Sequence, residues 1–160
     1  MSQAAAPSSP TTPPVISGVI EEVHADWVQV RVPSTDYRLR LVPGQGISTS
    51  VGDKIDGVIR AQALRMDVIP AGGRYIEPVQ GRPRRVQGRV IGGNVSLNEV
   101  YVKAGPSLII TPMAPQRASD FSIGQMVSFD VRNGATIETA KVADNARTIA
   151  TSEDSSQGTG

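Results

Sequence analysis

The sequence predicts an all-β protein made of two small five-stranded barrels in tandem. Two observations carry this prediction. Short runs of alternating apolar and polar residues recur along the chain, separated by Gly, Pro, Asp and Ser, and this pattern is typical of strands with one buried face. The same runs also occur twice in the same order, which indicates an internal duplication.

The clearest repeated block is VGDKIDGVIR at 51–60, which aligns with IGQMVSFDVR at 123–132. This alignment places Gly52 on Gly124 and Arg60 on Arg132. Three further blocks keep the order: ISGVI at 16–20 with VQGRV at 86–90, DWVQVR at 26–31 with NEVYVK at 98–103, and LRLVP at 39–43 with LIITP at 108–112. Repetition in one order, with small insertions between blocks, favours duplication over chance.

Each repeat contains five predicted strands. Those of the first repeat are 15–23, 27–32, 37–42, 54–60 and 64–69, and those of the second are 84–91, 99–103, 107–111, 126–132 and 136–140. Five short strands that each bury one face avoid open edges by closing on themselves. We therefore expect barrels of OB type, with an SH3-like topology as the alternative.

Composition sets the predicted domain boundaries. The first barrel covers 15–69, a linker rich in Gly and Pro covers 70–83, and the second barrel covers 84–140. The stretches at 1–14 and 141–160 are rich in small and polar residues, so we expect disordered tails that bury no core.

The composition also excludes several kinds of site. The chain has no cysteine and a single histidine, His24, which excludes disulfides, thiolate metal sites and multi-histidine metal clusters. The formal net charge is +1, too balanced to indicate nucleic-acid binding by itself. No apolar run is long enough to span a bilayer and the N-terminus does not read as a secretory signal, so we expect a cytoplasmic protein with no membrane contact.

The stretch WVQVRVPSTDYRLRLV at 27–42 predicts a hairpin whose loop is 33–36. This loop pairs Val30 with Leu39 on the inner face, and a slip of one residue would turn the apolar set toward water. The same register adds two more inner pairs: Val28 with Leu41, and Val32 with Tyr37.

On the outer face of this hairpin, the register places Arg31 opposite Arg38 and Gln29 opposite Arg40. Like charges directly across a strand pair are destabilising. We therefore expect compensation from a nearby carboxylate, a protein partner or an anionic ligand.

The second repeat shows a related surface. Its hairpin loop at 104–106 turns Tyr101 and Lys103 outward, and the strand at 84–91 adds two arginines on its outer side. An aromatic beside cations on the first three strands is the arrangement with which OB-type barrels stack bases and hold phosphates. The candidate site residues are Trp27, Arg31, Arg38, Arg40, Arg85, Arg89, Tyr101 and Lys103.

The alternative interpretation is a solvated surface. Outward cations on strands are commonly only hydrated, and nearby carboxylates at Glu21, Glu22, Asp26 and Asp36 are available to neutralise them. The densest basic segment, GRPRRVQGR at 81–89, is open to the same two interpretations: an anionic partner near the barrel junction, or a solvated linker.

The order of a V-x-G-x-V strand (Val86, Gly88, Val90), a hairpin and a block such as 51–60 or 123–132 resembles the TOBE and molybdate-binding MOP families. The resemblance implies tandem OB-type barrels that are either fused to transporter ATPases or act as small oxyanion binders. The Ser-x-Arg-Asn stretch that precedes the first glycine in molybdate binders is replaced here by PPVISG and RRVQG, so the resemblance assigns no ligand residues.

The sequence therefore predicts a non-enzymatic binding or adaptor module without a cofactor, since no acid and base stand at the spacing that general acid–base catalysis needs. A protein partner or a second copy of the chain is the first expectation. Two alternatives stay open: single-stranded nucleic acid bound on the outer face of the first three strands, and a small oxyanion held at the barrel interfaces.

Overall fold

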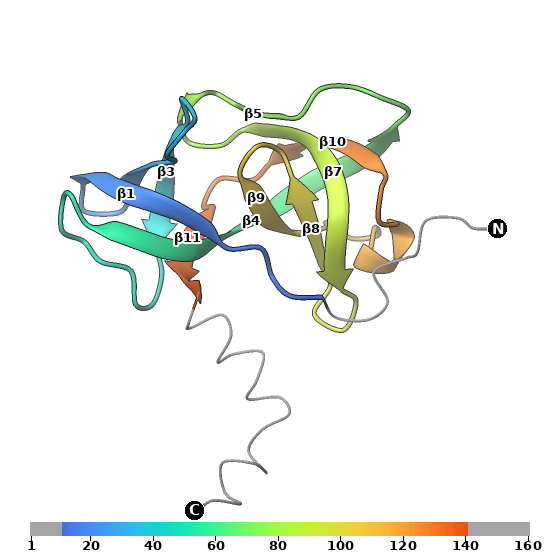
Figure 1. The fold of residues 1–160 in the computed structure, drawn as a ribbon. Helices are drawn as coiled ribbons and strands as arrows, with labels where there is room; N and C mark the ends of the chain where they lie inside the picture. Colours follow the sequence, from blue (N-terminus) through green and yellow to red (C-terminus); the bar gives the residue numbers. More distant parts are fainter. Residues whose placement is uncertain (1–10, 141–160) are drawn as a thin grey trace, which may run out of the picture.

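A computed structural model describes residues 11–140 and confirms the all-β class (Figure 1). Within these residues, eleven strands form one hydrogen-bonded sheet. The strands are β1 (Ile16–Val23), β2 (Val28–Arg31), β3 (Arg38–Pro43), β4 (Lys54–Ile69), β5 (Tyr75–Glu77), β6 (Gln80–Gly81), β7 (Arg85–Asn94), β8 (Glu99–Lys103), β9 (Ser107–Thr111), β10 (Met126–Val131) and β11 (Thr136–Thr139). One 3-10 turn, η1 (Ala118–Asp120), precedes β10.

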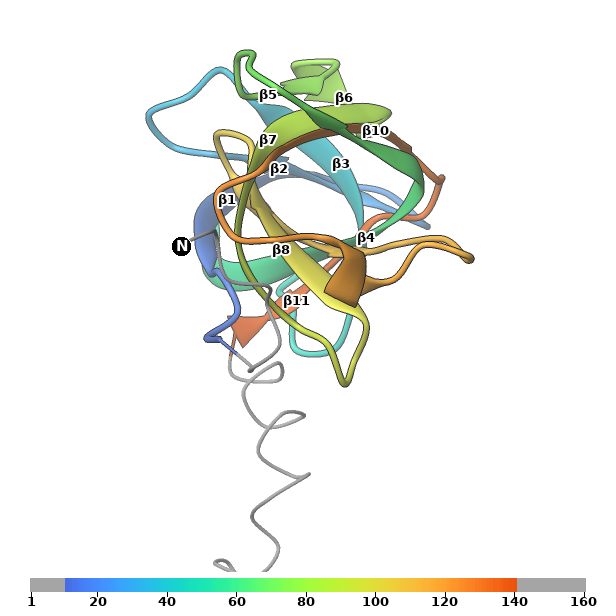
Figure 2. The same cartoon turned by 90° about the vertical axis from the view of Figure 1, so that its right-hand side faces the viewer.

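The strand pairings close into two rings that share β4. In the first ring, β1 pairs with β2, β2 with β3, β3 with β11, β11 with β4, and β4 with β1. In the second ring, β7 pairs with β8, β8 with β9, β9 with β4, β4 with β10, and β10 with β7. The β3–β11 and β9–β4 pairs are parallel, and the other pairs in the rings are antiparallel. Figure 2, turned by 90°, shows β7 and β10 side by side as in Figure 1.

The strands predicted at 54–60 and 64–69 are in fact one continuous strand of 16 residues, β4. Its beginning pairs with β1 and β11, whereas its end pairs with β10 in the second ring. The prediction that each repeat supplies its own fifth strand is therefore wrong. The segment RAQAL at 60–64 contains none of the usual turn residues, so the strand continues without a turn from one ring into the other.

The last strand of the second repeat completes the exchange. Thr136 of β11 lies beside Val42 of β3 and also opposite Arg60 of β4, so β11 closes the first ring. The predicted linker is not irregular throughout, because β5 pairs with β7 and β6 pairs with β3. The strands of the two sequence repeats are thus interleaved.

The two rings share a local backbone geometry. In the first, the Gly52 amide donates to the Ile20 carbonyl oxygen (2.7 Å), and in the second the Gly124 amide donates to the Val90 carbonyl oxygen (2.8 Å). Both glycines have positive φ angles, 95° and 100°, which glycine adopts without the cost that a side chain would bring. The first strand of each ring also bulges just after this contact, at Ile20/Glu22 and at Val90/Gly92.

The apolar core runs through both rings as one cluster, which includes Ile20, Leu39, Ile59, Leu108 and Phe129. A second, small cluster packs Val58 of β4 against Tyr101 and Ile109, and all three side chains are almost fully buried. The latter two lie on the side of their strands opposite to the core-facing neighbours Val102 and Ile110, so Val58 of β4 packs against part of the outer face of the β8–β9 hairpin.

A charged contact also joins the strands of the two rings. Arg60 of β4 forms an ion pair with Glu99 of β8 and another with Glu138 of β11, the latter at 3.1 Å between Nε and Oε2. Burial opposes the charge of Arg60, but the two carboxylates outweigh it, so that the pKa of Arg60 is raised above its ordinary value. The guanidinium therefore remains charged where β4 passes from one ring to the other.

The prediction of a disordered tail at 1–14 that buries no core is wrong for residues 11–14. The Thr11 amide donates to the Gly93 carbonyl oxygen (3.1 Å), and the Gly93 amide donates to Thr11 Oγ1 (3.0 Å). Pro13 is buried. The remaining tail predictions, 1–10 and 141–160, lie outside the described residues.

Replacing Gly88 with alanine tests the packing of β7 against β8. A Cβ at this position would lie 2.4 Å from the Lys103 carbonyl oxygen and 2.8 Å from Val102 Cγ1. Because the first obstacle is backbone, we expect Gly88→Ala to lower the free energy of unfolding by about 1–3 kcal/mol, measured by urea denaturation. Gly73→Ala is the matched control, since nothing lies within 4 Å of its Cβ position. Equal stability of the two variants would contradict the described packing.

Candidate functional site

The hairpin of β2 and β3 has the predicted register, with Val30 opposite Leu39 and Arg31 opposite Arg38. Its loop is closed by Thr35, whose Oγ1 donates to the Val32 carbonyl oxygen (2.7 Å) and accepts from the Tyr37 amide (3.0 Å). The tight loop fixes the register, and with it the position of every cation on the outer face.

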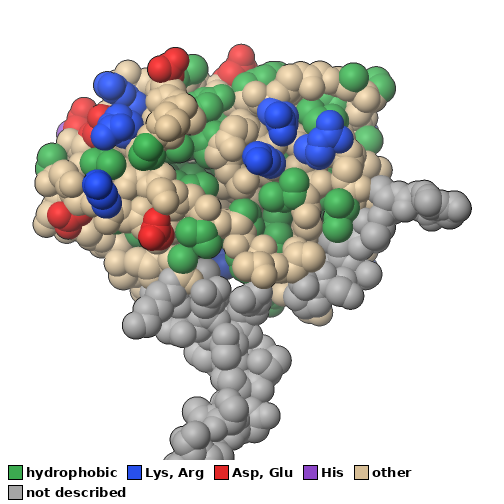
Figure 3. All heavy atoms as spheres, in the orientation of Figure 1, with side chains coloured by type: hydrophobic (Ala, Val, Ile, Leu, Met, Phe, Trp, Pro, Cys, Tyr) green, Lys and Arg blue, Asp and Glu red, His purple; other side chains and the backbone are tan. Residues whose placement is uncertain are grey.

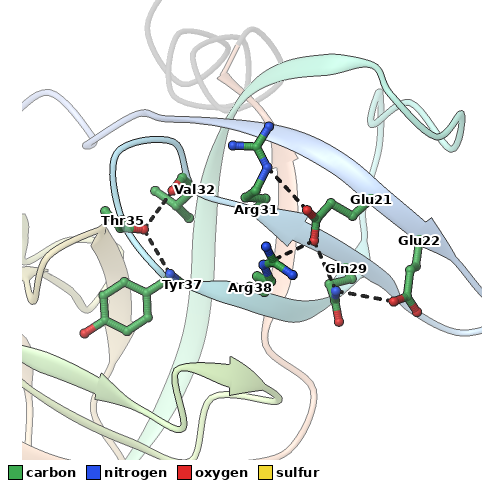
Figure 4. A network of polar contacts seen from close by, with 8 residues as sticks. All are labelled: Glu21, Glu22, Gln29, Arg31, Val32, Thr35, Tyr37 and Arg38. Atoms are coloured by element: carbon green, nitrogen blue, oxygen red, sulfur yellow. Dashed lines mark hydrogen bonds and ion pairs between the residues drawn. The ribbon is translucent and has the colours of Figure 1, made fainter.

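The opposed pair Arg31 and Arg38 is neutralised within the protein. Glu21 of β1 lies between the two guanidinium groups, with Oε2 3.3 Å from Arg31 Nε and Oε1 3.8 Å from Arg38 Nε (Figure 4). The carboxylate that the sequence analysis expected as one form of compensation is thus Glu21. These two arginines and Glu21 therefore form an ion-pair network within the hairpin region.

Gln29 is not solvent-exposed as the outer-face prediction implied, since only 3% of its surface is accessible. Its Nε2 donates to Glu21 Oε1 (3.2 Å) and to Glu22 Oε2 (3.4 Å) (Figure 4). The carboxylates of β1 extend over this part of β2, which buries the amide and satisfies it.

Trp27 lies immediately before β2 and is half-buried by two polar neighbours. The His24 ring stacks on it with centroids 3.8 Å apart, and the Arg40 Cζ lies 4.4 Å from its centroid. His24 Nε2 is also 2.9 Å from Glu22 Oε1. Arg40 is thus held by a cation–π contact, which leaves its guanidinium donors available.

A groove of about 570 Å³ opens beside Trp27 and Arg40. Three segments distant in the sequence form its walls: the end of the β1–β2 connection with β3, the linker around β6, and the turn before β11. Its lining residues are Asp26, Trp27, Arg40, Leu41, Val42, Pro78, Gln80, Gly81, Arg82, Arg84, Asn133, Gly134 and Ala135.

Backbone hydrogen bonds hold these walls in place. The Arg38 amide donates to the Val79 carbonyl oxygen (2.9 Å), and β6 then runs parallel to β3, which brings the linker arginines beside Arg40. On the other side, the Val42 amide donates to the Ala135 carbonyl oxygen (2.8 Å). The groove therefore depends on both the linker and the pairing of β11 with β3.

The electrostatic character of the groove is cationic. Arg40, Arg82 and Arg84 line it, and none of them forms an ion pair with a carboxylate of residues 11–140. Asp26 is the single acidic residue among the lining residues that the structure describes. Unpaired guanidinium groups on a concave surface favour a planar oxyanion such as a phosphate or a carboxylate.

The predicted site residues of the second repeat do not join this groove. Tyr101 is buried, so its expected exposure is wrong; β4 covers it. Arg85 donates to Asp130 Oδ1 (2.8 Å) and Ser128 Oγ (2.7 Å), and the hydrogen bond to Asp130 raises the pKa of Arg85. Arg89 and Lys103 are exposed and stand opposite each other on β7 and β8.

Two of the eight predicted residues, Trp27 and Arg40, thus line the groove. The arginines at 82 and 84 were noted in the sequence as a basic cluster, but nothing there joined them to Trp27. The two-residue strand β6 brings these arginines beside β3, and it is too short to produce a periodic pattern in the sequence.

Within residues 11–140, no three or more acidic or histidine side chains gather closely enough to hold a metal ion. The same part of the chain contains no helix with the length and apolar character needed to cross a membrane. Comparisons of the chain with protein-family models, with curated proteins and with solved structures found no match.

Glu21→Gln tests the ion-pair network on the hairpin. Removing the carboxylate leaves Arg31 and Arg38 opposed without compensation, so we expect the free energy of unfolding to fall by about 1 kcal/mol. Adding Arg38→Gln to this variant should recover part of the loss, because the repulsion disappears. Asp36→Asn, in the exposed hairpin loop, is the control and should change stability little. A Glu21→Gln variant as stable as the parent protein in thermal denaturation would contradict the network.

Proposed function

We propose that the protein binds single-stranded nucleic acid in the groove beside Trp27 and Arg40. We propose in addition that its two rings are OB-type barrels that arose by duplication and exchange their fifth strands. The repeated glycine contacts, the repeated bulges and the parallel closure in both rings support this origin. In this interpretation β11 is the fifth strand of the first barrel, and the end of β4 is the fifth strand of the second.

The place of the groove carries the functional proposal. It lies over β3, between the connection from the first to the second strand and the turn that enters the fifth strand. OB-type barrels bind oligonucleotides on the face of strands two and three, between these same two loops. At the corresponding place in the second ring, Tyr101 and Ile109 are buried against Val58 of β4, so the proposed groove concerns the first ring alone.

The lining residues supply the two interactions that single strands require. Arg40, Arg82 and Arg84 offer guanidinium groups to successive phosphates without first breaking an ion pair. The indole of Trp27, with His24 stacked on it, offers an aromatic platform. A base reaches this platform either by replacing His24 or by extending the stack, and such stacking tolerates any base sequence.

Charge reversal in the groove tests this function. We expect Arg82→Glu combined with Arg84→Glu to weaken the binding of a mixed-sequence single-stranded DNA by about 100-fold or more, since hydrogen bonds to charged groups contribute about 1.5 kcal/mol each and tenfold in affinity corresponds to about 1.4 kcal/mol. Trp27 is the only tryptophan, so quenching of its fluorescence reports binding directly. The titration is repeated at low and at physiological salt.

The control variant carries the same change in charge at a distance from the groove, Lys54→Glu with Arg117→Glu. It should bind as tightly as the parent protein. Inorganic phosphate and molybdate are titrated separately, and binding of these ions without binding of DNA would favour the small-oxyanion alternative. No response of the parent protein to any of these ligands would reject the proposed function and leave docking on another protein as the stronger hypothesis.

A further inference from the structure

A second cationic feature lies on the other ring. Arg89 of β7 and Lys103 of β8 stand directly opposite each other, and both side chains are exposed. Arg89 Nη1 donates to the Gly124 carbonyl oxygen (2.8 Å), which orients the guanidinium on the surface. No carboxylate of residues 11–140 forms an ion pair with either cation. We call these two residues the cation pair.

The cation pair contrasts with the other opposed cations of the structure. Arg31 and Arg38 also face each other across two strands, but Glu21 lies between them. Like charges across a strand pair are destabilising when nothing neutralises them. The cation pair carries this cost in the free protein, and an anion bound from outside would remove it.

The surface between the groove and the cation pair is continuous. A second, shallow hollow of about 640 Å³ shares Pro78 and Arg84 with the groove and extends to Arg85 at the start of β7. From there the side chains at 85, 87 and 89 lie on the outer side of β7, because the residues between them are buried. Four residues of extended strand span about 13 Å, so β7 leads directly from the hollow to the cation pair.

The edge of β7 between the hollow and the cation pair carries additional polar and aromatic groups. Tyr75 pairs with Gln87, and its Oη donates to Gln87 Oε1 (3.2 Å). Gln87 Nε2 in turn donates to the Gly73 carbonyl oxygen (2.9 Å), which places the exposed Arg74 next to this part of β7. In Figure 3, Lys and Arg side chains gather over β7 and the end of β8, with no acidic side chain among them.

We propose that a single strand bound in the groove continues along the outer side of β7 and that the cation pair binds its phosphates. This inference rests on the proposed function, because it extends the same ligand beyond the groove. Arg85 is neutralised by Asp130, and Glu77 borders the shallow hollow. The path therefore attracts phosphates at its two ends and only weakly in the middle.

Oligonucleotide length tests this path. Affinity is measured for DNA of about 4 and about 16 nucleotides, the limits of site size for a single OB-type barrel. We expect the parent protein to bind the longer DNA more tightly. Arg89→Glu with Lys103→Glu should remove this advantage, and it should lower the slope of log affinity against log salt for the longer DNA by about 1.4, or about 0.7 for each lost phosphate contact.

The short DNA serves as the internal reference, because it fills only the groove. The affinity for the short DNA should not change in the double variant Arg89→Glu with Lys103→Glu. The control variant Lys54→Glu with Arg117→Glu should leave the affinity for both DNA lengths unchanged. Unchanged binding of the longer DNA by the double variant would overturn the path while leaving the groove intact. Failure of the parent protein to bind either length would reject the proposed function itself.

The single variant Lys103→Glu allows the melting temperature of the free protein to be compared with the affinity for the longer DNA. It replaces the repulsion in the cation pair by an attraction to Arg89, so the free protein should melt at a higher temperature while its affinity for the longer DNA falls. A higher melting temperature without any loss of affinity would mean that the pair is only strained surface, and this result would overturn the proposal.

Discussion

The continuity of β4 is the constraint on which the rest of the structure depends. This strand begins beside β1 and ends beside β10, with Arg60 near its middle, so one stretch of backbone belongs to both rings. Because the end of β4 is committed to the second ring, the first ring is open until β11 arrives from the other end of the described chain. Neither ring closes with the residues of its own repeat, and Arg60, held by Glu99 and Glu138, fixes the point where they meet.

The same strand pairings build the groove and limit it to one ring. The turn at 133–135 reaches the first ring only because β11 closes it, and the linker arginines reach it only because β6 pairs with β3. In the second ring, Val58 of β4 packs against Tyr101 and Ile109 and buries this part of the outer face. An arrangement with two similar units thus presents two different outer surfaces: a groove on one, and an exposed row along β7 on the other.

Local patterns in the sequence were sufficient for most strands and for both hairpin registers, because side-chain alternation and loop length determine them. They divided β4 in two and missed the short strands β5 and β6. They were not sufficient for the partners of β4 and β11, since alternation shows that a face is buried but not against which strand. Tyr101 illustrates the limit for the site: its position on the outer side of β8 follows from the register, whereas its burial depends on β4. Trp27 and Arg40 were both predicted as site residues of the same outer face, but their proximity to Arg82 depends on the pairing of β6 with β3, which leaves no periodic pattern in the sequence.

The most direct test of this account is a map of backbone amide chemical shifts in the ¹⁵N-labelled chain of 160 residues during titration with a short single-stranded DNA. The account predicts that the amides of 26–27, 40–42, 81–82, 84 and 133–135 shift together and saturate at one ligand concentration, because these residues border one groove. Shifts confined to one segment, or located on strands away from the groove, would contradict the central claim that segments distant in the sequence assemble one binding site.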